Sequence, residues 1–180
     1  MIENRAEVPL LIAFADLTRF MAQAERSDDL GLAETLDACY ERIAAMVRAG
    51  GGRVVKFVGD AALLVFPDGE VDRGVETLLA LKDSIDALMV QRAWDCRLTI
   101  MAHFGTAIAG GFGEAGDKRY DIIGKAVNVT ATLESTGVTL SAEAFRKLGP
   151  ELRTRFKKHT PPITYIRVQD SHRSRTRIRV

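Results

Sequence analysis

Two short apolar runs that meet at a Gly-Asp pair constrain most strongly what this chain of 180 residues can fold into. The runs cover residues 54–58 and 61–66, and Gly59 and Asp60 separate them. Apolar, β-branched runs joined by a Gly-Asp dipeptide predict a tight β-hairpin. The carboxylate of Asp60 is therefore expected at the tip of a rigid ribbon, not on a loose loop.

A second carboxylate ends another apolar run. Residues 8–15 read VPLLIAFA, which is typical of a buried central strand, and Asp16 follows them directly. Two acids at the ends of two neighbouring strands can share a cation. We therefore take Asp16 and Asp60 as the leading functional candidates.

The composition is that of a single globular domain, with 47% hydrophobic and 27% charged residues. A net charge of +1 gives no general attraction to nucleic acid or to a membrane. The longest wholly apolar stretch is about eight residues, far below the ~20 of a spanning helix. The start, MIENRAEVP, lacks the basic-then-apolar order of a secretion signal. We expect a cytoplasmic protein without a membrane segment, in which Cys39 and Cys96 are free buried thiols.

Strands and helices alternate along the rest of the chain. Helical periodicity starts at Thr18, is interrupted near residues 27–29, and ends at the glycines 50–52. Its buried face is expected to comprise Leu36, Cys39, Tyr40, Ile43, Met46 and Val47. Further helices are expected over residues 71–92, 126–135 (with Val127, Val129 and Leu133 buried) and 142–149. The helix over residues 71–92 is expected to bury an apolar stripe made of Val75, Leu78, Leu79, Leu81, Ile85, Leu88 and Met89. Further strands are expected over residues 97–104, 106–109, 120–123, 138–140, 152–158 and 163–168. This order predicts an α+β or α/β fold with a mixed sheet.

The glycine-rich segment at residues 111–116 and the arginine-rich C-terminal tail are both conspicuous, but neither is taken as a functional site. The motif GFGEAG at residues 111–116 matches the dinucleotide fingerprint, but turn and strand residues follow it where a helix should begin. We interpret it as a hairpin loop. We expect one domain over residues 1–170 and a flexible basic tail over residues 171–180, whose alternating arginines could instead contact an anion.

Three blocks, taken in order, resemble the catalytic domain of class III nucleotidyl cyclases between about Pro9 and Val168. FADLTRF at residues 14–20 resembles the first metal-binding block of that family, and KFVGDAALLVF at residues 56–66 resembles the second. HFGTAIAGGFG and RYDIIGKAVNVTATLE, between residues 103 and 134, resemble the third. The resemblance implies a ferredoxin-like or palm-type βαββαβ core, with a mixed, mainly antiparallel sheet flanked by helices.

The resemblance assigns Asp16 and Asp60 to two divalent metal ions, Mg²⁺ or Mn²⁺. Hard divalent ions prefer carboxylate oxygens, and a metal pair lowers the pKa of the attacking ribose 3′-hydroxyl and neutralises the triphosphate. The backbone N–H groups from Leu17 through Thr18 to Phe20 would cradle the phosphates.

The same resemblance assigns the base to Lys56 and Asp121. A lysine can donate to adenine N1 and a carboxylate can accept from the exocyclic amine, whereas guanine presents the opposite pattern, so this pair predicts ATP. Asn128 matches the asparagine that orients the ribose. Either Lys157 or Lys158 would contact the triphosphate from the final hairpin.

Three positions depart from the family pattern. Thr132 stands where the family has its transition-state arginine, and loss of such a donor typically costs about 10²–10³-fold in rate. Arg19 replaces a small glycine, and Met21 replaces the following threonine. Two roles are open for Arg19: partial replacement of the missing arginine, or an ion pair with a surface acid.

The resemblance therefore predicts an adenylate cyclase-like, head-to-tail homodimer that converts ATP to 3′,5′-cyclic AMP and pyrophosphate, with an activity lowered by Thr132. Asp16 and Asp60 of one chain would face Lys56, Asp121 and Asn128 of the other, at two equivalent sites. The alternative is a catalytically degenerate cyclase-fold domain that binds nucleotide or a partner and signals by dimerisation. A diguanylate cyclase would need a G-G-[DE]-E-F turn, whereas this hairpin reads V-G-D-A-A.

Overall fold

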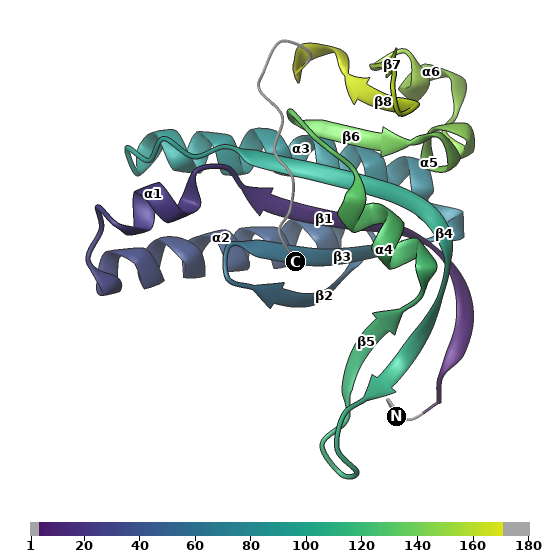
Figure 1. The fold of residues 1–180 in the computed structure, drawn as a ribbon, viewed down its shortest axis with the longest axis horizontal. Coiled ribbons are helices and arrows are strands. Elements are labelled where there is room, and N and C mark those ends of the chain that lie inside the picture. Colours follow the sequence, from purple (N-terminus) through teal and green to yellow (C-terminus); the bar gives the residue numbers. More distant parts are fainter. Residues whose placement is uncertain (1–3, 171–180) are drawn as a thin grey trace.

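The fold is an eight-stranded sheet with helices on both faces, seen in a computed structural model that describes residues 4–170 (Figure 1). The tail expected over residues 171–180 lies outside the described residues. The strands are β1 (Ala6–Leu17), β2 (Arg53–Val58), β3 (Ala61–Pro67), β4 (Leu98–Phe112), β5 (Arg119–Ile123), β6 (Val138–Ser141), β7 (Phe156–His159) and β8 (Thr164–Arg167). The helices are α1 (Phe20–Ala24), α2 (Asp29–Ala49), α3 (Val71–Gln91), α4 (Lys125–Thr132), α5 (Ala142–Lys147) and α6 (Pro150–Arg153).

The sheet topology confirms the α+β prediction. The strand order is β2-β3-β1-β4-β6-β8-β7, and β5 pairs with β4 outside this path. Elements β1, α2, β2, β3, α3 and β4 form the βαββαβ core, and its strand pairs are all antiparallel. The pairing of β4 with β6 is parallel, so the sheet is mixed.

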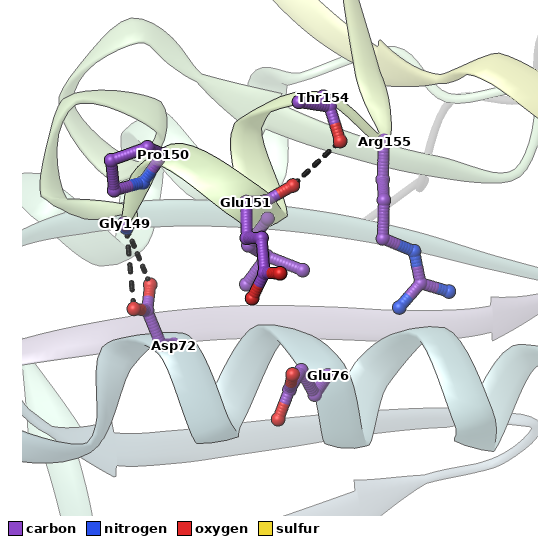
Figure 2. Close-up of a pocket in the computed structure, with 8 residues that line it drawn as sticks. Asp72, Glu76, Gly149, Pro150, Glu151, Thr154 and Arg155 are labelled. Carbon is purple, nitrogen blue, oxygen red and sulfur yellow. Dashed lines mark hydrogen bonds between the residues drawn. The ribbon is translucent and has the colours of Figure 1, made fainter.

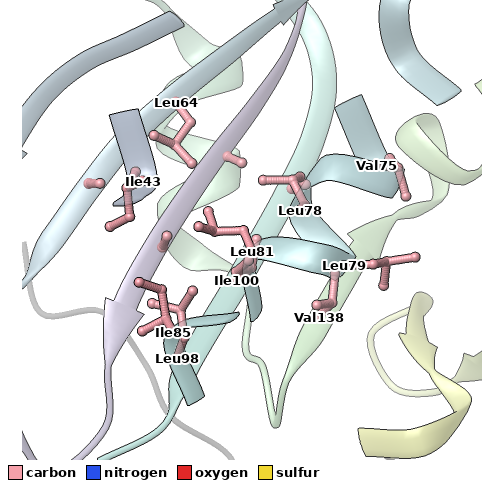
Figure 3. Close-up of a cluster of buried hydrophobic side chains, with 14 of the residues drawn as sticks. Ile43, Leu64, Val75, Leu78, Leu79, Leu81, Ile85, Leu98, Ile100 and Val138 are labelled. Carbon is pink, nitrogen blue, oxygen red and sulfur yellow. The ribbon is translucent and has the colours of Figure 1, made fainter. Parts of the chain in front are cut away.

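Helices α2 and α3 cover one face of the sheet, and α4 lies on the other (Figure 1). Side chains of α3 pack onto β3, β4 and β6 in the larger of two cores (Figure 3). The predicted apolar stripe of α3 is fully buried, from Val75 to Met89. On the opposite face, Ala126 of α4 packs with Ile12, Leu63 and Ile122 in a smaller core. The site described below lies on this second face.

The Gly-Asp hairpin forms as predicted. Val58 pairs with Ala61, so Gly59 and Asp60 make a two-residue turn. Gly59 has a φ of 58°, a left-handed conformation that glycine adopts without steric cost. The local sequence therefore accounts for this turn.

Strand β4 is unbroken up to Phe112, whereas the sequence predicted two strands, residues 97–104 and 106–109, on either side of Gly105 and a loop over residues 111–116. Strand β1 pairs with β4 from Ala6 opposite Ala109 to Leu17 opposite Leu98. Strand β5 then pairs with residues 108–112 of β4. Pairing with β1 holds Gly105 in an extended conformation, and pairing with β5 does the same for Gly110 and Gly111. The conformational freedom of glycine does not by itself predict this conformation.

Two helix predictions were also wrong at one end, and one short helix was predicted as a strand. Helix α1 begins at Phe20 instead of Thr18, because Arg19 adopts a left-handed conformation. Helix α4 ends at Thr132 instead of Ser135, and it leaves Val129 exposed because Thr130 takes the buried position. Residues 150–153 form helix α6, with Pro150 in the first turn, where a strand was predicted from residue 152.

Candidate active site

Asp16 and Asp60 come together where β1 ends and the β2–β3 hairpin turns. Ala15 pairs with Ala62, so the antiparallel register places Asp60 level with Leu17. Burial, followed by the charge of Asp60 and a hydrogen bond with it, raises the pKa of Asp16 to about 7. Burial also raises the pKa of Asp60, although hydrogen bonds with its own backbone, with Asp16 and with the Leu17 backbone oppose this.

Two half-buried carboxylates in contact repel each other when both are ionised, and a divalent cation between them would remove that repulsion. The two side chains therefore fit the metal ions that the family implies. Among residues 4–170, no group of three or more His, Cys, Asp and Glu side chains is arranged to hold a metal ion. Further ligands would have to come from phosphate, backbone or water oxygens, which Mg²⁺ accepts readily.

The segment that follows Asp16 is fixed to the start of β4. The N–H of Thr18 donates to the carbonyl of Arg97 at 2.8 Å, and the N–H of Arg97 donates to the Thr18 hydroxyl at 3.0 Å. The hydroxyl of Thr99 donates to the carbonyl of Asp16 at 3.1 Å. The turn is thus rigid, and the N–H of Thr18, one of the predicted phosphate donors, is already engaged.

Arg19 stands at the centre of this turn with a φ of 58°. A residue with a Cβ is strained in this region, which explains why a glycine is the family's choice here. Its guanidinium forms an ion pair with Asp95, and both side chains are exposed. Of the two roles considered for Arg19, this contact is the ion pair with a surface acid. Exposed pairs are weak, so the guanidinium can readily change partners.

Lys56 and Asp121 meet between β2 and β5. The Lys56 Nζ lies 2.7 Å from an Asp121 carboxylate oxygen, with 47% and 25% of the two side chains exposed. The other carboxylate oxygen accepts the N–H of Ile122 at 2.8 Å. Arg53 stacks over the ring of Tyr120, 3.8 Å from its centroid, and gives the two strands a second contact. The proposed base-reading donor and acceptor are therefore adjacent.

A cavity of about 330 Å³ connects Lys56 with the two carboxylates on the face that carries α4. Its polar lining comes from Asp16, Lys56 and Asp60. Its apolar wall comes from Phe14, Val58, Ala61, Ala62, Leu63, Ile122 and Val127. An apolar wall with a few convergent polar groups is typical of ligand sites.

A larger hollow of about 460 Å³ lies elsewhere, between α3 and the segment from α5 to α6 (Figure 2). Asp72, Glu76 and Glu151 line it, together with Arg155. The Asp72 carboxylate accepts the N–H of Gly149 at 3.0 Å and caps α6 from outside. Three carboxylates would repel a triphosphate, so we do not place a nucleotide there.

The remaining predicted residues do not line the cavity of their own chain. Asn128 and Thr132 are exposed on α4, and the Thr132 hydroxyl donates to the Val129 carbonyl at 2.9 Å. Lys157 and Lys158 are exposed on β7, at the opposite edge of the sheet from β2. Leu17 is buried at the end of β1, and Phe20 is partly buried against the core.

Sequence reasoning missed two residues that touch this region, Asp95 and Tyr40. Asp95 has no local signal, since its partner Arg19 is distant in the sequence. Tyr40 was assigned to the buried face of α2, yet its hydroxyl donates to the carbonyl of Gly59 in the Gly59–Asp60 turn. A tyrosine, rather than a phenylalanine, on an apolar helix face was the available signal.

The sheet and its two adjacent carboxylates define the class of nucleotidyl cyclases, and comparison with known proteins agrees. Residues 3–159 match the Adenylate and Guanylate cyclase catalytic domain, so the chain belongs to this class III family. No helix within the described part of the chain has the length and apolar character needed to cross a membrane.

Two curated relatives illustrate the similarity. Adenylate cyclase 2 of Rhizobium meliloti (strain 1021) is 31% identical over 160 residues, which cover 79% of this chain and 42% of that protein. The adenylate cyclase of Anabaena cylindrica is 23% identical over 133 residues, which cover 69% of this chain and 26% of that protein. The chain thus spans less than half the length of either relative.

Solved structures share the fold at low identity. The adenylyl cyclase CyaB from P. aeruginosa superposes with a TM-score of 0.78 at 19% identity, over 90% of this chain and 93% of that one. The guanylyl cyclase Cya2 gives a TM-score of 0.74 at 17% identity, over 92% of this chain and 93% of that one. Proteins named for either nucleotide share this fold, so the base preference must be argued from side chains.

Proposed function

We propose that this domain is an adenylate cyclase that converts ATP to 3′,5′-cyclic AMP and pyrophosphate at a site shared by two copies of the chain. The contact between Lys56 and Asp121 is the observation that carries the proposal. It places an N–H donor and a carboxylate acceptor together, which is the complement of adenine N1 and its exocyclic amine. Guanine presents a carbonyl and an N–H at those positions and would meet the wrong partners.

In the reaction, the ribose 3′-hydroxyl gives up its proton to solvent water. Its oxygen forms a bond to the α-phosphorus while the bond from that phosphorus to the pyrophosphate oxygen breaks. Two divalent ions held by Asp16 and Asp60 would make the hydroxyl more acidic and neutralise the triphosphate. Lys56 and Asp121 orient the base, and Asn128 orients the ribose. Because the backbone N–H groups of Thr18 and Leu17 are engaged within the fold, the Phe20 N–H at the start of α1 and a lysine of β7 are left to bind the phosphates.

A second copy of the chain is proposed to complete the site. A cavity of about 330 Å³ is near the lower limit for ligand pockets, and a nucleoside triphosphate is an extended ligand. Exposed apolar side chains lie on three of the elements that line it, namely Val58 at the hairpin, Ile123 on β5 and Val129 on α4, and the exposed Ile108 of β4 pairs with Ile123. Such a patch favours docking of a partner. A head-to-tail homodimer would bring Lys56, Asp121, Asn128 and the lysines of β7 of one chain to Asp16 and Asp60 of the other.

A catalytically degenerate domain is the second candidate, and one observation favours it. Thr132 occupies the position of the transition-state arginine, and its hydroxyl is used within α4. Arg19 is our candidate to replace that charge. We include it in the proposed site as a contact to the triphosphate, for which its guanidinium would have to leave Asp95. A degenerate domain would bind nucleotide and dimerise without forming product.

The test is incubation of the purified protein with Mn²⁺ and either ATP or GTP, with chromatographic detection of cyclic product. The oligomeric state would be measured at the same concentration by sedimentation. Cyclic AMP from ATP in excess over cyclic GMP from GTP is the expected result. A confirmed dimer that forms neither product would favour the degenerate domain, and a preference for GTP would contradict the assignment of Lys56 and Asp121.

A further inference from the structure

We propose that Tyr40 is a positioning residue that holds the Gly59–Asp60 turn and thereby keeps the Asp60 carboxylate beside Asp16. The inference deepens the proposed function, because it rests on Asp60 as a metal ligand. Two contacts from α2 carry it. The Tyr40 hydroxyl donates to the Gly59 carbonyl, and the Tyr40 ring stacks on Phe57, with centroids 4.0 Å apart and planes at 20°.

The turn has little other support on its outer side. Strand β2 is at the edge of the sheet, and its pairing with β3 shifts register between Val54 and Lys56. Gly59 is exposed, and within the described chain no neighbouring atom lies within 4 Å of a Cβ placed on it. Packing therefore does not fix the tip of the hairpin, and the contact with α2 does so instead.

The Gly59 carbonyl is the part of the turn that controls Asp60. The Gly59 carbonyl and the Asp60 N–H belong to the same planar peptide unit. A hydrogen bond that holds the carbonyl oxygen therefore also fixes the orientation of the peptide plane that precedes the Asp60 Cα. With that plane held before Asp60, and with Ala61 held after it by pairing with Val58, the backbone of Asp60 is fixed on both sides and its carboxylate stays directed at Asp16. A hydrogen bond at Gly59 can thus align a ligand atom on the next residue.

The Tyr40 ring is only partly buried. On its outer side lies a surface hollow of about 530 Å³, lined by residues of α2 that include Ala33, Leu36 and Asp37. The hollow leaves room for the ring to rotate outward when the hydroxyl bond is lost. Removing that oxygen should therefore loosen the turn while the core beneath α2 stays packed.

Tyr40→Phe is the appropriate variant because it removes only the hydroxyl. Tyr165→Phe is the matched control, since Tyr165 stacks on Phe145 with centroids 3.6 Å apart and lies on β8, far from the hairpin in the sheet order. Amide hydrogen exchange would be measured by mass spectrometry on peptides that contain residues 57–62. We expect exchange there to be about 5-fold faster in Tyr40→Phe and unchanged in Tyr165→Phe, in line with the net value of one hydrogen bond.

The second readout is the Mn²⁺ concentration that gives half-maximal cyclase activity at saturating ATP. It should rise about 5-fold in Tyr40→Phe, and excess Mn²⁺ should restore the turnover, while the thermal midpoint changes little. Unchanged exchange at residues 57–62, or the same change in Tyr165→Phe, would overturn the inference. A wild-type protein without activity would contradict the proposed function alone, because hydrogen exchange decides the role of Tyr40 without any turnover.

Discussion

Lys56 and Asp121, 65 residues apart in the sequence, lie 2.7 Å apart where β2 approaches β5. The two strands are not hydrogen-bonded to each other, since β5 pairs with β4 and β2 pairs with β3. The contact is therefore made by side chains across a gap in the sheet, at the rim of the cavity. It provides one donor and one acceptor at the place where the proposed function needs a base to be recognised.

Lys56→Met should raise the KM for ATP about 10-fold or more, because a hydrogen bond to a charged group is removed from the base. The thermal midpoint should stay close to the wild-type value, since the Lys56 side chain is 47% exposed. Steady-state kinetics with ATP and GTP would measure the effect. An unchanged KM for ATP would show that Lys56 does not contact the base.

Arg19→Gly should stabilise the fold by about 1 kcal/mol, because glycine adopts the left-handed conformation at this position without strain. Turnover should fall at the same time if the guanidinium contacts the triphosphate. Asp95→Ala is the control, since it removes the ion pair and leaves Arg19 in place, and its effect on stability should be below about 0.5 kcal/mol. Arg19→Gly with turnover equal to or above the wild type would exclude a role in catalysis.

Thr132→Arg should raise turnover, because it returns a donor to the position that the family uses for the charge developing on the phosphates. A gain of about 10–100-fold in kcat is expected, with a smaller change in KM. Thr132 is exposed at the end of α4, so an arginine there needs no repacking. A folded, dimeric variant with unchanged kcat would show that another group already serves this purpose.

Features that depend only on residues close together in the chain, such as turns and the buried face of a helix, could be predicted from the sequence. The Gly59 turn and the buried stripe of α3 follow from local composition and period, and both are present. The meeting of Asp16 and Asp60 was expected from two strand ends, and the structure brings them together. Their role as metal ligands stays a prediction.

The features that could not be predicted from the sequence depend on contacts between residues far apart in the chain. Gly105 lies in an extended strand because β1 faces it, and no local pattern indicates that ladder. The partners of Arg19 and Tyr40 are Asp95 and the Gly59 carbonyl, both on segments distant in sequence. Such contacts depend on how the layers pack, which a one-dimensional pattern does not specify.

A structural prediction concerns the ion pair that joins β8 to α3. Arg167 forms two hydrogen bonds of 2.7 Å with Asp83, and 5% and 62% of their side chains are exposed. The hydrogen bond from Arg167 lowers the pKa of Asp83 below its usual value. Since the folded pKa lies below the unfolded one, the pair stabilises the fold above the unfolded pKa and loses this effect as the pH falls through the folded pKa.

Asp83→Asn should therefore lower the free energy of unfolding by about 1 kcal/mol at pH 7, a modest value because Asp83 is largely exposed. The difference from the wild type should shrink below about pH 4, where the carboxyl becomes protonated. Urea denaturation at several pH values would measure it. A difference that stays constant down to pH 3 would show that the charge of Asp83 does not matter.

The shared site is tested most directly by mixing two variants that are each inactive, Asp60→Asn and Asn128→Ala. Each lacks a residue that the proposal takes from a different chain, so a mixed dimer keeps one intact site. Random exchange of chains makes half of the dimers mixed, and cyclic AMP formation should return to about one quarter of the wild-type rate. If exchange of chains is confirmed and the mixture still forms no cyclic AMP, the two groups do not meet across a dimer interface and the account is wrong.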